Sequence, residues 1–149
     1  MNMNWFINLI NSVVFQTVIS GLILFILSQM IQNFILEPLK SFKATIGKID
    51  NLLKYHSNVI FSGQTLSAEI KIRSMDTIRD LSCELESKYK QIPFRDFFAN
   101  IRLLPTKINI SESARGLIFI SNACARNEFI DKNFETVSKI RKNLNIPEI

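Results

Sequence analysis

Residues 13–31 read VVFQTVISGLILFILSQMI, a run of 19 residues without a charged side chain. The uncharged region continues to Leu36, and the first charge is Glu37, within the segment QNFILEPLKSFK at 32–43. A helix needs about 20 mostly apolar residues to cross roughly 30 Å of hydrocarbon. The run therefore predicts a transmembrane helix within residues 1–36.

Two other interpretations of an apolar N-terminal run are a cleaved signal peptide and a buried helix of a soluble protein. A signal peptide has a basic start and a small-residue cleavage site, but the tail MNMN has no basic side chain and no such site follows the run. A soluble helix of this length normally carries charges on one face. We therefore expect a single-pass membrane helix, with Trp5 at the interface where aromatic rings are enriched.

The charges predict on which side of the membrane the rest of the chain lies. All 18 Lys and Arg residues and all 13 acidic residues follow position 36, and the net charge is +5. Lys40, Lys43 and Lys48 lie within about fifteen residues of the apolar run, where the positive-inside rule is counted. We expect these lysines at the membrane interface, the C-terminal part in the cytoplasm and the N-terminus outside.

A stripe of small and polar residues marks the predicted span: Thr17, Gly21, Ser28 and Gln32. At about 3.6 residues per turn they fall on one side of the helix, and such a stripe lets helices approach closely and hydrogen-bond in lipid. The stripe predicts a helix–helix contact in the membrane. Single-pass helices also tolerate scattered polar residues, and Leu24 interrupts the stripe, so we favour that interpretation over a pore.

Pro38 follows the border between the uncharged and charged parts of the chain. Proline is tolerated in the first turn of a helix, and the residue before it disfavours the helical conformation. We therefore predict a kink or a break at Pro38, followed by a juxtamembrane helix within 37–62.

The juxtamembrane segment has an apolar stripe at alternating spacings of three and four residues. Its members are Leu39, Phe42, Ile46, Ile49, Leu53, His56 and Ile60. This is a heptad pattern, which serves equally for packing within one chain or for pairing between chains. Three heptads are marginal for an independent coiled coil, so we favour packing within the chain.

The remaining residues, 63–149, show further helical periodicity. We expect a long helix over about 65–91, a short one after Pro93, a central one of about fourteen residues from Ser111, and a last one from Asp131 or Asn133 to Pro147. Their predicted core residues are Ile70, Met75, Ile78, Leu81, Leu85, Tyr89, Ile92, Phe94, Phe97, Phe98, Ile101, Phe134, Val137, Ile140 and Leu144.

Runs of alternating polar and apolar residues are few, so the predicted class is all-α. We expect an N-terminal transmembrane helix followed by a small cytoplasmic bundle of about four to five helices. The organisation is then a tail and span at 1–36, a juxtamembrane helix at 37–62 and a cytoplasmic helical domain at 63–149.

Several short segments resemble a group of bacterial single-pass membrane proteins that has no assigned activity. They are EPLKSFKATIGKI at 37–49, IPF at 92–94, GLIFISNA at 116–123 and KIRKNL at 139–144. The group has an apolar N-terminal helix, a juxtamembrane E-P-[IL]-x-x-[FY]-[KR]-x-x-I-G-x-I segment and a helical soluble part. The resemblance implies placement in the inner (cytoplasmic) membrane of a bacterium and carries over no functional residue.

The sequence offers no recognisable catalytic, cofactor-binding or metal-binding motif. There is one histidine, and the four glycines are too scattered for a phosphate-binding loop. Cys83 and Cys124 lack a partner at metal-ligand spacing, and we expect buried or half-buried reduced thiols. The charges form no dense basic stripe, so we do not expect nucleic acid as a partner. We predict that the protein is not an enzyme and has no cofactor.

Two functions are consistent with this organisation. The first is a membrane-anchored cytoplasmic helical interaction module that contacts the lipid bilayer and binds a protein partner or a second copy through its cytoplasmic domain. The alternative is an oligomerising membrane effector, of the bacterial toxin or anti-phage type, in which the cytoplasmic domain senses a signal and the spanning helices perturb the bilayer. The sequence identifies no small-molecule ligand.

Overall fold

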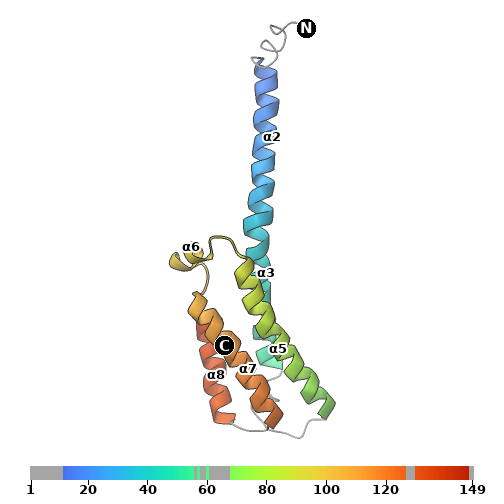
Figure 1. The fold of residues 1–149 in the computed structure, drawn as a ribbon, viewed down its shortest axis with the longest axis vertical. Helices are drawn as coiled ribbons and strands as arrows, with labels where there is room; N and C mark the ends of the chain where they lie inside the picture. Colours follow the sequence, from blue (N-terminus) through green and yellow to red (C-terminus); the bar gives the residue numbers. More distant parts are fainter. Residues whose placement is uncertain (1–11, 56, 58–59, 61–67, 127–129, 148–149) are drawn as a thin grey trace. The chain divides into compact units, whose positions relative to one another are not determined.

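The computed structural model describes residues 12–55, 57, 60, 68–126 and 130–147. In these ranges every regular element is helical (Figure 1), which confirms the all-α class. Trp5 and His56 lie outside the described residues. The elements are α2 (Val13–Ile31), the π-helix η1 (Gln32–Leu36), α3 (Glu37–Tyr55), α5 (Ala68–Gln91), α6 (Arg95–Asn100), α7 (Lys107–Arg126) and α8 (Ile130–Asn143).

Helix α2 is an isolated apolar helix. Ser12 caps its start, because the Ser12 hydroxyl oxygen accepts a hydrogen bond from the Phe15 N–H at 3.1 Å. None of the 19 residues of α2 is buried. Within the described residues, one helix is long and apolar enough to cross a membrane, judged by length and composition, and it lies near the N-terminus as the sequence predicts. Backbone contacts divide the chain into two compact units between Glu37 and Pro38.

The chain stays helical through this border. The Glu37 N–H donates to the Gln32 carbonyl, five residues back, which makes a wider π-helical turn. Pro38 has no N–H, and in a regular α-helix its ring would clash with the carbonyl of Phe34. The wider turn relieves that clash. Because the helix runs unbroken over Val13–Tyr55, a break at Pro38 is not found, and the kink stays a prediction.

Helix α3 buries most of the heptad stripe against other helices of its own chain. Phe42 and Ile49 are fully buried, and the ring centroids of Phe42 and of Tyr89 in α5 are 5.7 Å apart. The buried face of α3 also includes Thr45 and Leu52, which the sequence pattern did not indicate. In this structure the stripe therefore packs within the chain.

A polar cluster joins α3 to α5 beside this buried face. Lys48 Nζ donates to the two carboxylate oxygens of Glu84 at 2.9 and 3.2 Å, and the Thr45 hydroxyl donates to Glu84 at 3.0 Å. The Lys48 hydrogen bond lowers the pKa of Glu84 below its usual 4.5, against the opposing effect of partial burial and with help from Thr45. On the other side of α3, Arg141 of α8 donates to Asp50 at 3.0 Å.

Helix α7 is the central helix of the bundle and packs against both α5 and α8 (Figure 1). Leu117 and Ile120 are fully buried, which agrees with the central helix predicted from Ser111 onward. The Ser121 hydroxyl donates to the Met75 carbonyl of α5 at 3.1 Å, and the Ser82 hydroxyl of α5 donates to the Ala114 carbonyl at 2.9 Å. These bonds satisfy polar groups in the apolar interface and fix an antiparallel register.

The bounds of α7 and α8 differ from those predicted. Helix α7 begins at Lys107 rather than Ser111, because the Thr106 hydroxyl caps it by accepting from the Asn109 N–H at 3.3 Å. Helix α8 ends before Pro147, at Asn143. Asn145 then adopts a left-handed φ of 56°, a conformation that asparagine tolerates better than most residues.

Some predicted core side chains are exposed. Phe134 of α8 is 67% exposed, although Val137, Ile140 and Leu144 of the same predicted face are buried. Cys83 is exposed, contrary to the expectation of a buried or half-buried thiol, whereas Cys124 is buried as expected. A single apolar residue on a helix surface is ordinary, so Phe134 alone carries no further meaning.

The prediction that the short helix α6 contributes a compact aromatic core is wrong. Phe94, Phe97 and Ile101 are 74%, 60% and 55% exposed, and only Phe98 of the predicted set is partly buried. The spacing was interpreted as a core-facing stripe, but a single short helix has the same spacing whether its apolar side faces inward or outward.

Two left-handed residues hold α6 in place. Phe94 precedes the helix with φ 52°, and Arg102 follows it with φ 60°. The Leu103 N–H donates to the Phe98 carbonyl at 2.9 Å and the Arg102 N–H to the Ala99 carbonyl at 3.0 Å, which is a Schellman ending. The position of Arg102 in such an ending usually holds glycine, because a left-handed conformation costs an L-residue about 1–2 kcal/mol.

Gly47 of α3 and Gly116 of α7 should respond oppositely to substitution by alanine. A Cβ at Gly116 would lie 3.0 Å from Ile140 Cγ1 and 3.1 Å from Thr136 Cγ2, whereas a Cβ at Gly47 meets nothing within 4 Å. We expect Gly116→Ala to lower the free energy of unfolding by about 1–3 kcal/mol through overpacking. Gly47→Ala should raise it by about 0.5–1 kcal/mol through helix propensity. Circular dichroism of denaturant unfolding of the full chain in one detergent measures both, and equal effects would contradict the packing.

Glu84 should make stability depend on pH. Its pKa is lowered in the folded protein, so its contribution is complete above the usual value of 4.5 and is lost as the pH falls through the folded pKa. Glu84→Gln should therefore have a lower free energy of unfolding than the parent chain at neutral pH, and the two values should converge in acid. A difference that persists unchanged through the acid range would show that the carboxylate charge is not what stabilises this contact.

Candidate functional site

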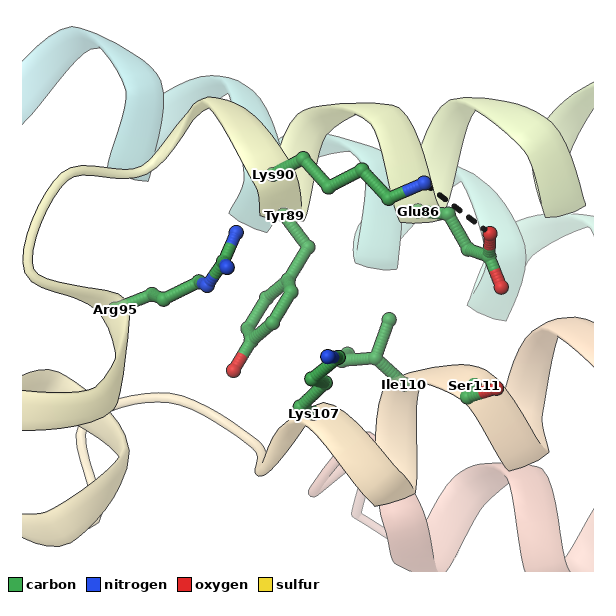
Figure 2. A pocket seen from close by; sticks show the side chains of 7 residues that line it. All are labelled: Glu86, Tyr89, Lys90, Arg95, Lys107, Ile110 and Ser111. Carbon is green, nitrogen blue, oxygen red and sulfur yellow. Dashed lines mark ion pairs between the residues drawn. The ribbon is translucent and has the colours of Figure 1, made fainter.

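A basic pocket lies where the end of α5 meets the start of α7. Helix α5 ends at Gln91, a segment containing α6 follows, and α7 begins at Lys107. This connection brings the end of α5 and the start of α7 together (Figure 2). The cleft has a volume of about 530 Å³. It is lined by Glu86, Tyr89, Lys90, Arg95, Lys107, Ile110 and Ser111.

The pocket carries an excess of positive charge. Lys90, Arg95 and Lys107 face a single lining carboxylate, Glu86, and the Lys90–Glu86 separation is a long 3.9 Å. Among the described residues Lys107 and Arg95 form no ion pair. No direct ion pair with a described residue therefore compensates these two charges.

Tyr89 lines the pocket and carries a buried hydroxyl. The residue is 3% exposed, and its hydroxyl has no hydrogen-bond partner among the described residues. Figure 2 shows its ring between the side chains of Arg95 and Lys107, and the Arg95 guanidinium carbon is 5.9 Å from the ring centroid. Burial raises the pKa of Tyr89, Asp96 raises it further and Arg95 opposes the shift, so the hydroxyl keeps its proton and can donate.

These groups suit the binding of an anion. The cations supply attraction, and the hydroxyls of Tyr89 and Ser111 supply donors. The first turn of the 20-residue helix α7 contributes the positive end of its dipole. A phosphate or carboxylate group is the natural occupant, and its oxygens would accept from the buried Tyr89 hydroxyl. Within the described residues no group of His, Cys, Asp and Glu is placed to hold a metal ion.

The residues singled out from the sequence lie elsewhere. Lys40 and Lys43 are exposed on the first turns of α3, whereas Lys48 is engaged with Glu84. Their predicted role at the membrane interface, like that of Trp5, stays a prediction. None of them lines the basic pocket.

The polar stripe of α2 is partly satisfied by its own helix. The Thr17 hydroxyl donates to the Val13 carbonyl and the Ser28 hydroxyl to the Leu24 carbonyl, each at 2.8 Å. These hydroxyls do not need a second helix to satisfy them in an apolar environment. Gly21 and Gln32 are exposed, so a contact between spanning helices depends mainly on these two and stays a prediction.

Sequence reasoning missed the basic pocket for an identifiable reason. Tyr89 was assigned to an apolar helix face, which is correct for its ring but ignores its hydroxyl. Lys90, Arg95 and Lys107 come from three segments, and no spacing rule links them until α7 is seen to run antiparallel to α5. The available signal was a tyrosine and a lysine at the end of one helix, with a cation as the first residue of each of the next two helices, Arg95 of α6 and Lys107 of α7.

Comparison of the chain with protein-family models, with curated proteins and with solved structures finds no match. The resemblance of the 37–49 segment to bacterial single-pass membrane proteins stays a prediction.

Tyr89→Phe should separate stability from binding. Without an added anion, removal of a buried hydroxyl that lacks a partner should raise the free energy of unfolding by about 1 kcal/mol. The same change should reduce the stabilisation that inorganic phosphate gives the parent chain. Thermal unfolding in phosphate and in chloride at equal ionic strength measures both effects.

One lysine variant inside the pocket and one outside it complete this experiment. Lys107→Gln should also lose the phosphate effect, whereas Lys142→Gln, an exposed lysine outside the pocket, should keep it. Equal phosphate stabilisation in all four chains would contradict anion binding at this pocket.

Proposed function

We propose that this protein is a membrane-anchored helical interaction module of the bacterial inner (cytoplasmic) membrane. Helix α2 anchors it with the N-terminus outside, and the bundle of α3, α5, α6, α7 and α8 faces the cytoplasm. The bundle binds a protein partner or a second copy of the chain. The proposal assigns it a binding role and no reaction.

The observation that carries this proposal is the contrast between the two compact units. Helix α2 has no charge and no buried residue, so in water it would expose an apolar surface along its whole length. The free-energy cost of that exposure is about 25 cal/mol for each Å² of apolar area. The bundle buries its own apolar faces, with residues such as Phe42, Ile78 and Leu117 fully enclosed. One unit therefore requires an apolar solvent, and the other is suited to water.

The basic pocket supports a binding role for the bundle. Two of its cations, Arg95 and Lys107, form no ion pair with a described residue, and it offers the Tyr89 hydroxyl as a donor. An acidic or phosphorylated group of a protein partner has the complementary charge and acceptors. Binding there satisfies a buried hydroxyl and places the partner against rigid helix ends.

The effector alternative has less support. It requires spanning helices that associate through polar contacts, but the Thr17 and Ser28 hydroxyls are satisfied within α2. Contacts of this kind are worth only about 1 kcal/mol or less in membranes. We therefore favour the anchored module.

Thiol labelling in intact cells tests the anchor and its orientation. Cys83 is exposed on α5 and serves as a native reporter, and Asn4→Cys adds one to the N-terminal tail. With the full chain in bacterial cells, a membrane-impermeant maleimide should label the Asn4→Cys position at once and Cys83 only after permeabilisation. The chain should stay in the membrane pellet after alkaline extraction. A Cys83→Ser variant supplies the background, and labelling of Cys83 in intact cells would overturn the orientation.

The same cells test the interaction. A photo-crosslinking amino acid in place of Ile108, which is 70% exposed beside Lys107, should give an adduct of defined mass, and Lys107→Gln should weaken it. The same amino acid at exposed Ser138 of α8 is the control. Absence of any adduct at 108, with normal membrane insertion, would count against the binding role while leaving the anchor intact.

A further inference from the structure

The segment around α6 presents an apolar surface to solvent. Phe94, Phe97, Ile101 and Leu103, here called the α6 face, are 74%, 60%, 55% and 46% exposed. Phe97 lies within α6, and Phe94 and Ile101 are the residues directly before and after it. A cluster of large apolar side chains on a surface usually marks a contact with another apolar phase.

The backbone holds this face outward. Phe94 and Arg102 are both left-handed, with φ 52° and 60°, although glycine is the residue that adopts such angles without strain. The Schellman bonds of Leu103 and Arg102 to Phe98 and Ala99 close the helix between them. Strained conformations at non-glycine residues are most often kept at functional surfaces.

The α6 face belongs to the end of the bundle at which α3 begins. Leu103, Leu104 and Pro105, which follow α6, line a hollow together with Phe42 and other residues from the first half of α3. Phe42 is six residues after Leu36, the end of the uncharged run, and six residues of helix span about 9 Å. If α2 crosses the membrane, this end of the bundle therefore emerges next to the bilayer.

The charges near the face suit an anionic leaflet. Residues 94–103 contain Arg95 and Arg102 against one acid, Asp96, and Lys40 and Lys43 are exposed on the first turns of α3. Aromatic side chains with neighbouring cations are the composition of segments that lie in the headgroup layer. Each such cation near an anionic surface adds attraction.

The α6 face by itself is too small to form a standard stable protein interface. A large aromatic side chain buries at most about 250 Å², and the four side chains are roughly half to three-quarters exposed. Together they offer less than the about 800 Å² per partner of a standard stable interface. A bilayer needs no such minimum, because the proposed span already holds the chain there.

We infer that the α6 face is a docking surface for the anionic cytoplasmic leaflet from which α3 emerges. Phe94 and Phe97 enter the boundary between headgroups and acyl chains, and Arg102 lies among the lipid phosphates. This inference rests on the proposed membrane anchor. It gives the bundle a second attachment to the bilayer, which fixes its tilt and so the direction in which the basic pocket opens.

A tryptophan reporter tests this docking in the full chain. Trp5 is the only tryptophan, so a Trp5→Phe background with Phe97→Trp has one emitter at the α6 face. Phe134→Trp in the same background is the matched control, because Phe134 is comparably exposed but lies on α8. Each chain is placed in nanodiscs of phosphatidylglycerol and phosphatidylcholine, with and without brominated acyl chains.

We expect brominated lipid to quench the Phe97→Trp chain at least about twofold more than the Phe134→Trp chain, and the excess to fall in discs of phosphatidylcholine alone. Unquenched emission from the Phe97→Trp chain in discs would overturn the inference. A red-shifted spectrum would then indicate a side chain in water, and a blue-shifted one a side chain covered by protein. Equal quenching in neutral and anionic discs would overturn the assignment to an anionic leaflet. Failure of the chain to enter discs would overturn the anchor itself, which is a separate outcome.

Discussion

The antiparallel packing of α7 on α5 is the contact on which the rest of the bundle depends. Its register is fixed by two buried serines, because Ser82 and Ser121 each donate to a backbone carbonyl of the opposite helix. A shift of either helix by one turn would break both hydrogen bonds between the helices, at a net cost of about 0.5–1.5 kcal/mol for each. The register places the end of α5 beside the start of α7, which forms the basic pocket, and leaves the intervening residues as the α6 excursion.

The α6 segment shows a conflict between local preference and the fold. Phe94 and Arg102 adopt angles that their side chains disfavour, and the apolar side chains between them remain in solvent. A water-soluble bundle would gain by placing glycine at both positions and polar residues on the exposed side. Natural sequences are locally consistent except where function opposes it. The docking that we infer would remove the part of this conflict that concerns the exposed apolar side chains, because they would then lie in the environment they prefer.

The sequence allowed some features to be predicted and not others. The uncharged apolar length identified the helix at 13–31, and a spacing of three and four residues sustained over several turns identified the stripe of α3. Helix α6 is only six residues long, so its pattern could not distinguish an inward from an outward apolar side. The pocket joins Tyr89, Arg95 and Lys107 through a register that buried serines determine. Serine carries no periodic signal of that kind.

The juxtamembrane lysines show why counting charges is weaker than placing them. The positive-inside rule counts Lys40, Lys43 and Lys48 equally, but Lys48 is hydrogen-bonded to Glu84 of α5, 36 residues away along the chain. Its charge is balanced by a carboxylate of the same bundle, whereas Lys40 and Lys43 form no ion pair with a described residue. The electrostatic bias that would orient α2 in the folded protein therefore comes from Lys40 and Lys43. Lys48 instead joins α3 to α5 through its hydrogen-bonded ion pair with Glu84, which also lowers the pKa of that carboxyl.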